Sequence, residues 1–304
     1  MTNEFAESLK RTAGQNAVRL FEPMALHTTF RCGGCADYFV SPENEDGLRQ
    51  TLSLCREKNM PYFVIGCGSN LLVSDRGYPG VIIEIGRGLG KIETDGRIVR
   101  AGAGARLSAF AAKCAEEGLT GAEFASGIPG TVGGAIYMNA GAYGGEMKQI
   151  VRSVRVLTKE GELVTRSSEE MAFAYRSSAV RTLGDIVLSA EFALEKGESE
   201  AIFRTMADLN ARRRDKQPLN FPSAGSTFKR PEGAFAGKLI QDAGLSGFSV
   251  GKARVSEKHC GFLINDGGTS AADVYRLIEE VRRIVQEKTG YLLECEVCFL
   301  GDFS

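Results

Sequence analysis

The sequence has almost no excess of charge of either sign. It contains 37 Lys and Arg residues against 38 Asp and Glu residues, so the formal net charge is −1. This balance gives no chain-wide field that would attract nucleic acid, and only a local basic patch is compatible with it. Histidine is scarce too. His27 and His259 are the two in the chain, and we expect each to make local hydrogen bonds and not to act as a general base.

Long apolar runs are absent as well. No stretch of about 18 apolar residues occurs, which excludes a membrane-spanning helix. The segment 1–19 carries Glu4, Glu7, Lys10 and Arg11 and has no apolar centre, so it does not resemble a secretory signal. We therefore expect a cytoplasmic protein.

Glycine is the residue type in excess. There are 37 glycines in 304 residues, about 12%, against an average near 7%. They are clustered and not periodic, which excludes collagen and indicates places where the backbone comes close to another group. The remaining composition, 43% hydrophobic and 25% charged, is that of a globular protein. A chain of this length is expected to form two or three lobes.

The eight cysteines include two CxxC pairs, Cys32/Cys35 and Cys295/Cys298. This spacing occurs in zinc sites and redox pairs. The second pair lies in a predicted strand, where residues three apart point to opposite faces. The first pair lacks the strand–helix context of a thioredoxin motif. We expect reduced thiols and no metal site.

Hydrophobic periodicity predicts an α+β protein. Strands are expected at 37–40, 62–65, 81–85, 185–194 and 292–300, hairpins at 92–99 and 151–165, and helices at 46–58, 105–117, 198–214 and 270–288. The basic run 212–216 before Pro218 indicates a hinge. We expect two cofactor-binding subdomains, 1–89 and 90–200, and a substrate domain, 201–304.

The first glycine segment runs from Gly66 to Asp75 after a predicted strand. A Gly-x-Gly at this place suggests a dinucleotide-binding fold, but Leu71 replaces the third glycine and the segment continues as a turn. Gly102-Ala-Gly104 is a second Gly-x-Gly that lacks its third glycine. The alternative is a non-helical cradle in which successive backbone N–H groups bind an anion. Ser69 and Asn70 would add side-chain donors.

The second glycine segment, 126–145, contains the adjacent pair Gly133 and Gly134. A core helix rarely keeps two neighbouring glycines, because each costs about 1 kcal/mol relative to alanine. We predict a short helix over 131–138 whose N-terminus faces phosphate and whose glycines allow a flat ligand to approach the backbone. Tyr143 lies near the end of the segment.

Four motifs together carry a resemblance to a known family. They are Thr28-Thr-Phe-Arg31, Gly68-Ser-Asn-Leu71, Gly127-Ile-Pro-Gly-Thr-Val-Gly-Gly134 and Asn139-Ala-Gly-Ala142. With these motifs the whole chain resembles the UDP-N-acetylenolpyruvoylglucosamine reductase family. The resemblance implies a two-subdomain FAD-binding fold of the vanillyl-alcohol-oxidase type with a C-terminal α+β substrate domain. It also implies NADPH-dependent reduction, through FAD, of UDP-N-acetylglucosamine enolpyruvate to UDP-N-acetylmuramate in peptidoglycan precursor synthesis.

The resemblance assigns roles to individual residues. Ser226 matches the proton donor, Arg176 the arginine that binds the substrate carboxylate, and Glu296 the C-terminal glutamate, with Glu294 as its rival. Lys216, Arg230 and Tyr143 are expected to bind substrate, and the segment 246–254 is a second candidate for closing over it. The expected cofactor-binding residues are Gly66, Gly68, Ser69, Asn70, Leu71, Ser126, Gly127, Thr131, Gly133, Gly134, Ala135, Asn139 and Gly141.

Two other functions remain open at this point. A flavin oxidase would share the cradle but transfer electrons to oxygen, and a carrier would bind flavin or nucleotide sugar without redox turnover. We expect a small nucleotide-sugar substrate, and neither nucleic acid, membrane nor an obligatory protein partner. The chain also lacks the tyrosine-bearing loop of the longer branch of the family, and the sequence does not define oligomeric state or cation dependence.

Overall fold

The computed structural model describes residues 2–304, with side chains from residue 4 onward, and these residues form two compact units. The first unit comprises Met1–Leu20, Tyr38–Cys67 and Val81–Arg213. The second comprises Phe21–Asp37, Gly68–Gly80 and Arg214–Ser304. The division into three domains at residues 89 and 200 stays a prediction.

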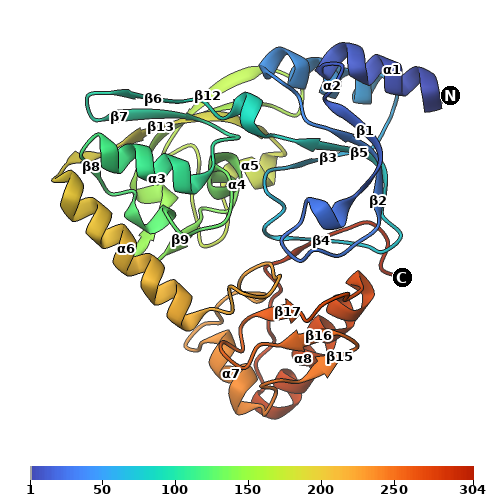
Figure 1. Cartoon of the computed structure of the whole chain (residues 1–304), viewed down its shortest axis with the longest axis vertical. Coiled ribbons are helices and arrows are strands. Elements are labelled where there is room, and N and C mark those ends of the chain that lie inside the picture. Colours follow the sequence, from blue (N-terminus) through green and yellow to red (C-terminus); the bar gives the residue numbers. More distant parts are fainter. Residues whose placement is uncertain (1) are drawn as a thin grey trace. The chain divides into compact units, whose positions relative to one another are not determined.

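A four-stranded sheet begins the fold, with strand order β1-β2-β5-β3 (Figure 1). The strands are β1 (Val18–Pro23), β2 (Cys35–Val40), β3 (Tyr62–Ile65) and β5 (Tyr78–Glu84), so three of the four were expected from the sequence. β3 and β5 are parallel. Helices α1 (Thr2–Ala13) and α2 (Glu45–Glu57) pack against each other.

A five-stranded antiparallel sheet forms the rest of the first unit, in the order β12-β11-β13-β7-β6. Both predicted hairpins are confirmed, because β6 pairs with β7 and β11 pairs with β12. The strands are β6 (Ile92–Asp95), β7 (Ile98–Gly102), β11 (Val151–Leu157), β12 (Leu163–Ser167) and β13 (Ile186–Ala193). The helices of this part are α3 (Leu107–Glu116), α4 (Val132–Tyr137), α5 (Ala179–Leu183) and α6 (Ser199–Lys216).

The first unit has one hydrophobic core, which includes residues of both sheets, and an ion pair joins the five-stranded sheet to helix α2. Phe110 of α3 and Phe192 of β13 are fully buried, with ring centroids 4.4 Å apart. Arg155 of β11 donates two hydrogen bonds, of 2.5 and 2.7 Å, to the carboxylate of Glu45 at the start of α2. This paired geometry fixes orientation as well as distance. Shorter ladders complete the unit: β8 (Leu119–Thr120) with β14 (Glu195–Lys196), and β9 (Gly141–Ala142) with β10 (Gly145–Glu146).

The second unit is built around the long helix α8 (Ala271–Thr289). Five residues of its predicted apolar face are fully buried, and Ile284 is partly buried; the five are Val274, Leu277, Ile278, Val281 and Val285. The helix packs on the three-stranded sheet β15 (Ser249–Val250), β16 (Ala253–Val255) and β17 (Leu263–Asn265), and on α7 (Ala236–Asp242). None of the helices in the range 2–304 has the length and apolarity needed to cross a membrane.

The predicted strand at 292–300 is wrong over most of its length. Only β18 (Cys298–Leu300) is a strand, and it pairs in parallel with β4 (Leu71–Val73), which the sequence did not predict. The preceding residues bond to a different partner, because Glu294 O accepts from Lys229 N and Glu296 N donates to Thr227 O, each at 2.8 Å. The segment 292–300 therefore does not form one continuous strand, because its first part bonds the segment 227–229 and its last part pairs with β4.

We predict that Asp75 anchors the N-terminus of α8. Its two carboxylate oxygens accept from Ala271 N at 2.8 Å and Ala272 N at 2.9 Å. These N–H groups have no partner within the helix, and a carboxylate there also interacts favourably with the helix dipole. Asp75→Ala should lower the free energy of unfolding by roughly 1 kcal/mol, measured by urea denaturation. Asp215→Ala, at an exposed position, is the control, and equal stability of the two variants would contradict the capping role.

Candidate active site

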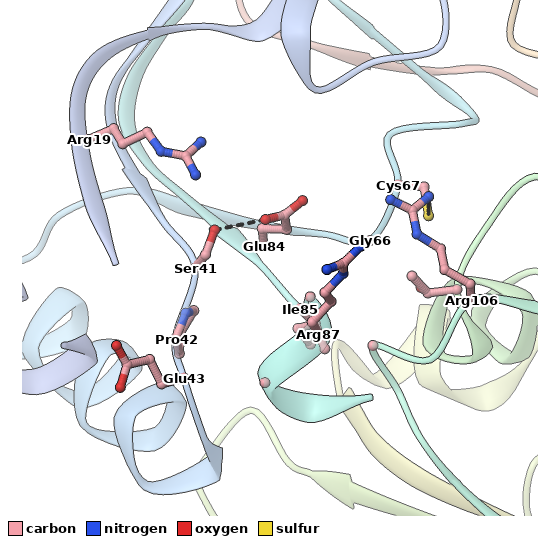
Figure 2. Close-up of a pocket in the computed structure, with 14 residues that line it drawn as sticks. Arg19, Ser41, Pro42, Glu43, Gly66, Cys67, Glu84, Ile85, Arg87 and Arg106 are labelled. Atoms are coloured by element: carbon pink, nitrogen blue, oxygen red, sulfur yellow. Dashed lines mark hydrogen bonds between the residues drawn. The ribbon is translucent and has the colours of Figure 1, made fainter. Parts of the chain in front are cut away.

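A cavity of about 410 Å³ opens within the first unit. It lies where the end of β3, the end of β5 and the start of α3 meet (Figure 2). The volume is within the range of small-molecule sites. Its lining residues are Arg19, Ser41, Pro42, Glu43, Gly66, Cys67, Glu84, Ile85, Gly86, Arg87, Gly88, Gly104, Arg106 and Thr131.

The cavity offers backbone and side-chain donors for an anion. Gly66 N and Cys67 N donate no hydrogen bond to any of residues 2–304. The same holds, over the described chain, for the N–H groups of Gly86, Arg87 and Gly88. Three arginines and two glutamates also line the space. The lining therefore combines a small positive excess with unused N–H groups, which suits a phosphate-bearing ligand.

Four of the lining side chains form two hydrogen-bonded pairs. Ser41 donates to Glu84 Oε2 at 2.7 Å, and Arg106 Nη1 donates to Cys67 Sγ at 2.7 Å. Burial raises the pKa of the Cys67 thiol, and the Arg106 charge opposes that rise. Figure 2 shows Arg106 beside Cys67 and the bond between Ser41 and Glu84. The Glu84 carboxylate keeps capacity to accept from hydroxyl donors.

Sequence reasoning predicted only Gly66 and Thr131 of this lining. It rejected Gly102-Ala-Gly104 as a dinucleotide motif, and that rejection agrees with the topology, because β7 pairs antiparallel with both β6 and β13 and is not part of a parallel βαβ unit. Gly104 nevertheless lines the cavity, and a Cβ on it would lie 1.8 Å from Gly86 O. The usable signal was a pair of Gly-x-Gly triplets, Gly86-Arg-Gly88 and Gly102-Ala-Gly104, each following a strand.

The first glycine segment continues in the second unit as Gly68, Ser69 and Asn70, whose N–H groups also lack an acceptor in the described structure. Gly68 has φ of +57°, and a Cβ would lie 2.0 Å from His27 O. Its positive φ and this close approach both require glycine. The segment is non-helical, as expected. Leu71 is buried in β4, where it pairs with Cys298.

The second glycine segment forms the predicted short helix, α4, with Thr131 as its N-cap. The expectation that its N-terminus faces phosphate needs correction. Val132 N donates to Ala105 O at 2.8 Å, Gly133 N to Ala103 O at 2.9 Å and Gly134 N to Thr131 Oγ1 at 3.4 Å. The first N–H groups of the helix are thus used by the protein itself.

Several expected cofactor ligands of the second segment have packing roles. The Asn139 side chain is buried and makes three contacts: it donates to Glu146 Oε2 and Ala174 O and accepts from Lys148 N. Ala135 is buried in the core. The remaining expected positions pack as follows: Ser126 Oγ accepts from Asn210, Gly127 lies against Asn210 and Arg213, Gly133 against Ala103, and Gly141 against Gly145. Gly134 is less crowded, because the nearest atom to an added Cβ would be Thr131 Oγ1 at 3.6 Å, an ordinary contact distance.

Two of the three expected catalytic residues come together in the second unit. Glu296 N donates to Thr227 O, the residue after Ser226, and Phe228 forms a bridge with Cys295. Ser226 is exposed, and its hydroxyl has no partner in the part of the chain that the structure describes. The rival Glu294 is a surface residue whose carboxylate pairs with Lys229. The contacts therefore favour Glu296 over Glu294 as the neighbour of Ser226.

Arg176 lies in the first unit on a strained turn. Its φ is +55°, which is uncommon for a residue with a side chain and costs on the order of 1–3 kcal/mol. Reciprocal hydrogen bonds between Ala174 and Ser177 hold the turn, and the guanidinium lies 5.1 Å from the centroid of the Tyr175 ring. Backbone strain of this kind is concentrated at functional sites.

The expected substrate-binding residues are exposed. Tyr143, with φ of +53°, is at the tip of the β9–β10 hairpin. Lys216 ends α6, and the Arg230 guanidinium lies 3.9 Å from the centroid of the exposed Phe235 ring. The segment 246–254 forms β15 and the start of β16, where Arg254 pairs with Asp266.

The cysteines and histidines stand apart from this chemistry. Burial raises the pKa of Cys32 to about 12 and that of Cys295 to about 11, whereas Cys35 is exposed. His27 bonds Glu22 at 2.8 Å, and His259 accepts from Gly261 N at 3.1 Å. Burial lowers the pKa of His259, because it disfavours the charged imidazolium.

Comparison with known proteins identifies the family. A model of the C-terminal domain of UDP-N-acetylenolpyruvoylglucosamine reductase matches residues 217–300, and a model of a FAD binding domain matches residues 36–167. The chain is 52% identical to the UDP-N-acetylenolpyruvoylglucosamine reductase of Lachnoclostridium phytofermentans, with 99% of each chain covered. The chain belongs to the UDP-N-acetylenolpyruvoylglucosamine reductase family. The corresponding protein of Agathobacter rectalis is 50% identical over the full length of both chains.

A solved structure of the family agrees with the fold. The UDP-N-acetylenolpyruvylglucosamine reductase of Thermus caldophilus has 34% identity and a TM-score of 0.80, covering 93% of this chain and 98% of that one. The expected fold class, a FAD-binding fold with a C-terminal α+β domain, is thereby confirmed. All lining residues of the cavity except Arg19, and all of its unused N–H groups, lie inside the range matched by the FAD binding domain model, and they fit the diphosphate of that cofactor.

We predict that Gly104→Ala weakens FAD binding. The added Cβ collides with backbone, not with a flexible side chain, so the two turns that line the cavity must separate. Overpacking of this kind costs about 1–3 kcal/mol, and the Kd for FAD, measured by flavin fluorescence titration, should rise about tenfold.

Gly134→Ala is the matched control for the fold, since its Cβ makes only an ordinary contact at 3.6 Å. The FAD-free Gly134→Ala protein should unfold at the wild-type denaturant concentration or above it. Unchanged FAD affinity of Gly104→Ala would show that the ligand does not use this cavity.

Proposed function

We infer that the chain catalyses the NADPH-dependent reduction of UDP-N-acetylglucosamine enolpyruvate to UDP-N-acetylmuramate, the reductive step of peptidoglycan precursor synthesis. Family membership over the whole chain supports this reaction. The observation within the structure that supports it best is the hydrogen bond from Glu296 N to Thr227 O, which joins the main chain of Glu296 to the residue after Ser226. Bound FAD supplies the chemistry of hydride transfer between NADPH and the methylene carbon of the enolpyruvyl group.

Arg176 is proposed to hold the enolpyruvyl carboxylate. Negative charge grows on this carboxylate and its neighbouring carbon as the methylene carbon is reduced. The planar guanidinium can donate two parallel hydrogen bonds to a carboxylate, which lysine cannot do in the same geometry. The strained turn at Arg176 is consistent with a side chain held in a fixed direction.

Ser226 is proposed to give the proton that completes the reduction. Gly225, with φ of +77°, forms the turn before it, and Thr227 beyond it is fully buried. In this arrangement buried Thr227 fixes the main chain next to Ser226, while the Ser226 hydroxyl is exposed to solvent. An unassisted serine hydroxyl is a poor acid, so a neighbour must polarise it, and Glu296 is the proposed neighbour.

The cofactor is proposed to bind through backbone groups more than through side chains. The N–H groups of Gly66 to Asn70 would donate to the diphosphate, with Ser69 adding its hydroxyl, and Gly134 leaves room for the flavin to approach α4. Arg87 and Arg106 would add positive charge at the cavity. No metal is required by this arrangement.

Lys216, Arg230 and Tyr143 are the proposed contacts of the substrate. The two cations suit the diphosphate of a nucleotide sugar. The exposed Phe235 ring lies 3.9 Å from the Arg230 guanidinium, close enough for a cation–π interaction. We further propose that the protein works in the cytoplasm on this small substrate, without nucleic acid, membrane or an obligatory protein partner.

Stopped-flow absorbance should separate the two half-reactions. NADPH is expected to bleach the flavin, and UDP-N-acetylglucosamine enolpyruvate to restore its absorbance rapidly without oxygen. Ser226→Ala should leave the bleaching rate unchanged and slow the recovery by about 10²-fold, the size of a general-acid contribution.

Ser223→Ala, three residues earlier, is the control and should match the wild type in both steps. Recovery driven by oxygen and not by the enolpyruvyl substrate would indicate an oxidase. Absence of bleaching would indicate a carrier, and equal loss of both steps in Ser226→Ala would assign that serine a structural role.

A further inference from the structure

The carboxamide of Asn70 holds the main chain at Glu296. Asn70 Nδ2 donates to Glu296 O at 2.9 Å. Both residues belong to the second unit, although 226 positions separate them in the sequence. The sequence predicted Asn70 as a donor to the cofactor, whereas the structure uses its side chain within the protein.

A second contact fixes the same two segments in register. Cys298 N donates to Asn70 O at 3.0 Å, and immediately beyond it β4 and β18 pair in parallel, with Cys298 opposite Leu71. Asn70 therefore bonds the C-terminal segment through both its side chain and its main chain. A substitution of the Asn70 side chain removes only the bond from Nδ2 to Glu296 O. The bond from Cys298 N and the β4–β18 ladder use main-chain atoms and remain.

Glu296 is thus held on both sides of its Cα atom. Its C=O accepts from Asn70, and its N–H donates to Thr227 O at 2.8 Å. Thr227 is fully buried, and its Oγ1 accepts from Leu263 N at 3.3 Å, so this support is itself rigid. Two anchors on one residue limit both the position of its Cα atom and the direction of its side chain.

The contact requires a hydrogen-bond donor at position 70. The partner is a carbonyl oxygen, which only accepts, so the group facing it must donate. A carboxylate would repel it, and an aliphatic group would leave it without a donor, which is unfavourable where the carbonyl is shielded from water. The Asn70 N–H, in contrast, has no acceptor among residues 2–304 and remains open to a ligand.

We propose that Asn70 is a positioning residue for the reaction, which fixes Glu296 beside Ser226 through the Nδ2–O hydrogen bond. The Asn70 hydrogen bond then links the segment predicted to hold the cofactor's diphosphate to the segment that carries Glu296. This inference rests on the proposed role of Glu296. A displacement of about 1 Å at a reacting group can cost up to 10²-fold in rate.

The test compares Asn70→Ala, Glu296→Gln and the double variant in the FAD-loaded protein. Asn70→Ala should slow flavin reoxidation by the enolpyruvyl substrate about tenfold or more, while the rate of reduction by NADPH and the Kd for FAD stay within about twofold. In the Glu296→Gln background the same substitution should add less than about twofold, because residues in one network are not additive. Asn70→Leu, similar in size and without a donor, repeats the test if the alanine variant folds poorly.

Asn220→Ala, at an exposed position of the same unit, is the matched control and should leave both half-reactions unchanged. If the reductions in the reoxidation rate multiply in the double variant, the inference is overturned. It is also overturned if Asn70→Ala weakens FAD binding and slows both half-reactions equally. If Glu296→Gln slows reoxidation and Asn70→Ala does not, the inference alone fails. If Glu296→Gln has no effect, the proposed role of Glu296 fails and the inference with it.

Discussion

Five consecutive backbone N–H groups, from Gly66 to Asn70, find no acceptor within residues 2–304. The proposed cofactor site depends on these groups. Backbone donors that are partly shielded from water need a partner. A run of them in a turn creates a concavity with positive potential. The sequence builds this run without helix or lysine, by means of Gly68 at a positive φ.

The loop 66–70 is fixed in its conformation by close contacts with neighbouring residues. A Cβ on Gly66 would lie 2.4 Å from Thr131 Oγ1 in the first unit, and one on Gly68 would lie 2.0 Å from His27 O in the second. Beyond the loop, β4 pairs with β18 and Asp75 caps α8. The N-terminus of α4 differs from this loop, because its first N–H groups already donate to acceptors within the protein. We therefore propose that the anion binds at the loop and not at the N-terminus of α4.

Local signals in the sequence defined most of the fold and part of the site. Strong periodicity gave α8 and the β11–β12 hairpin, and the break in the Gly-x-Gly pattern excluded a dinucleotide fold. The sequence could not show that 292–300 changes partners midway, because Thr227 and Asn70 are distant in the chain. Asn139 was misassigned for a related reason: its three partners become visible only when 146–148 and 174 fold around it.

Hydrogen–deuterium exchange of the amides at 66–70 tests the central claim most directly. The account predicts that adding FAD to the cofactor-free protein slows exchange in this loop by an order of magnitude or more, because a bound diphosphate supplies the missing acceptors. The amides of Val132 and Gly133, already bonded to Ala105 and Ala103, should change much less. Protection that appears at the start of α4 and not in the loop would contradict it.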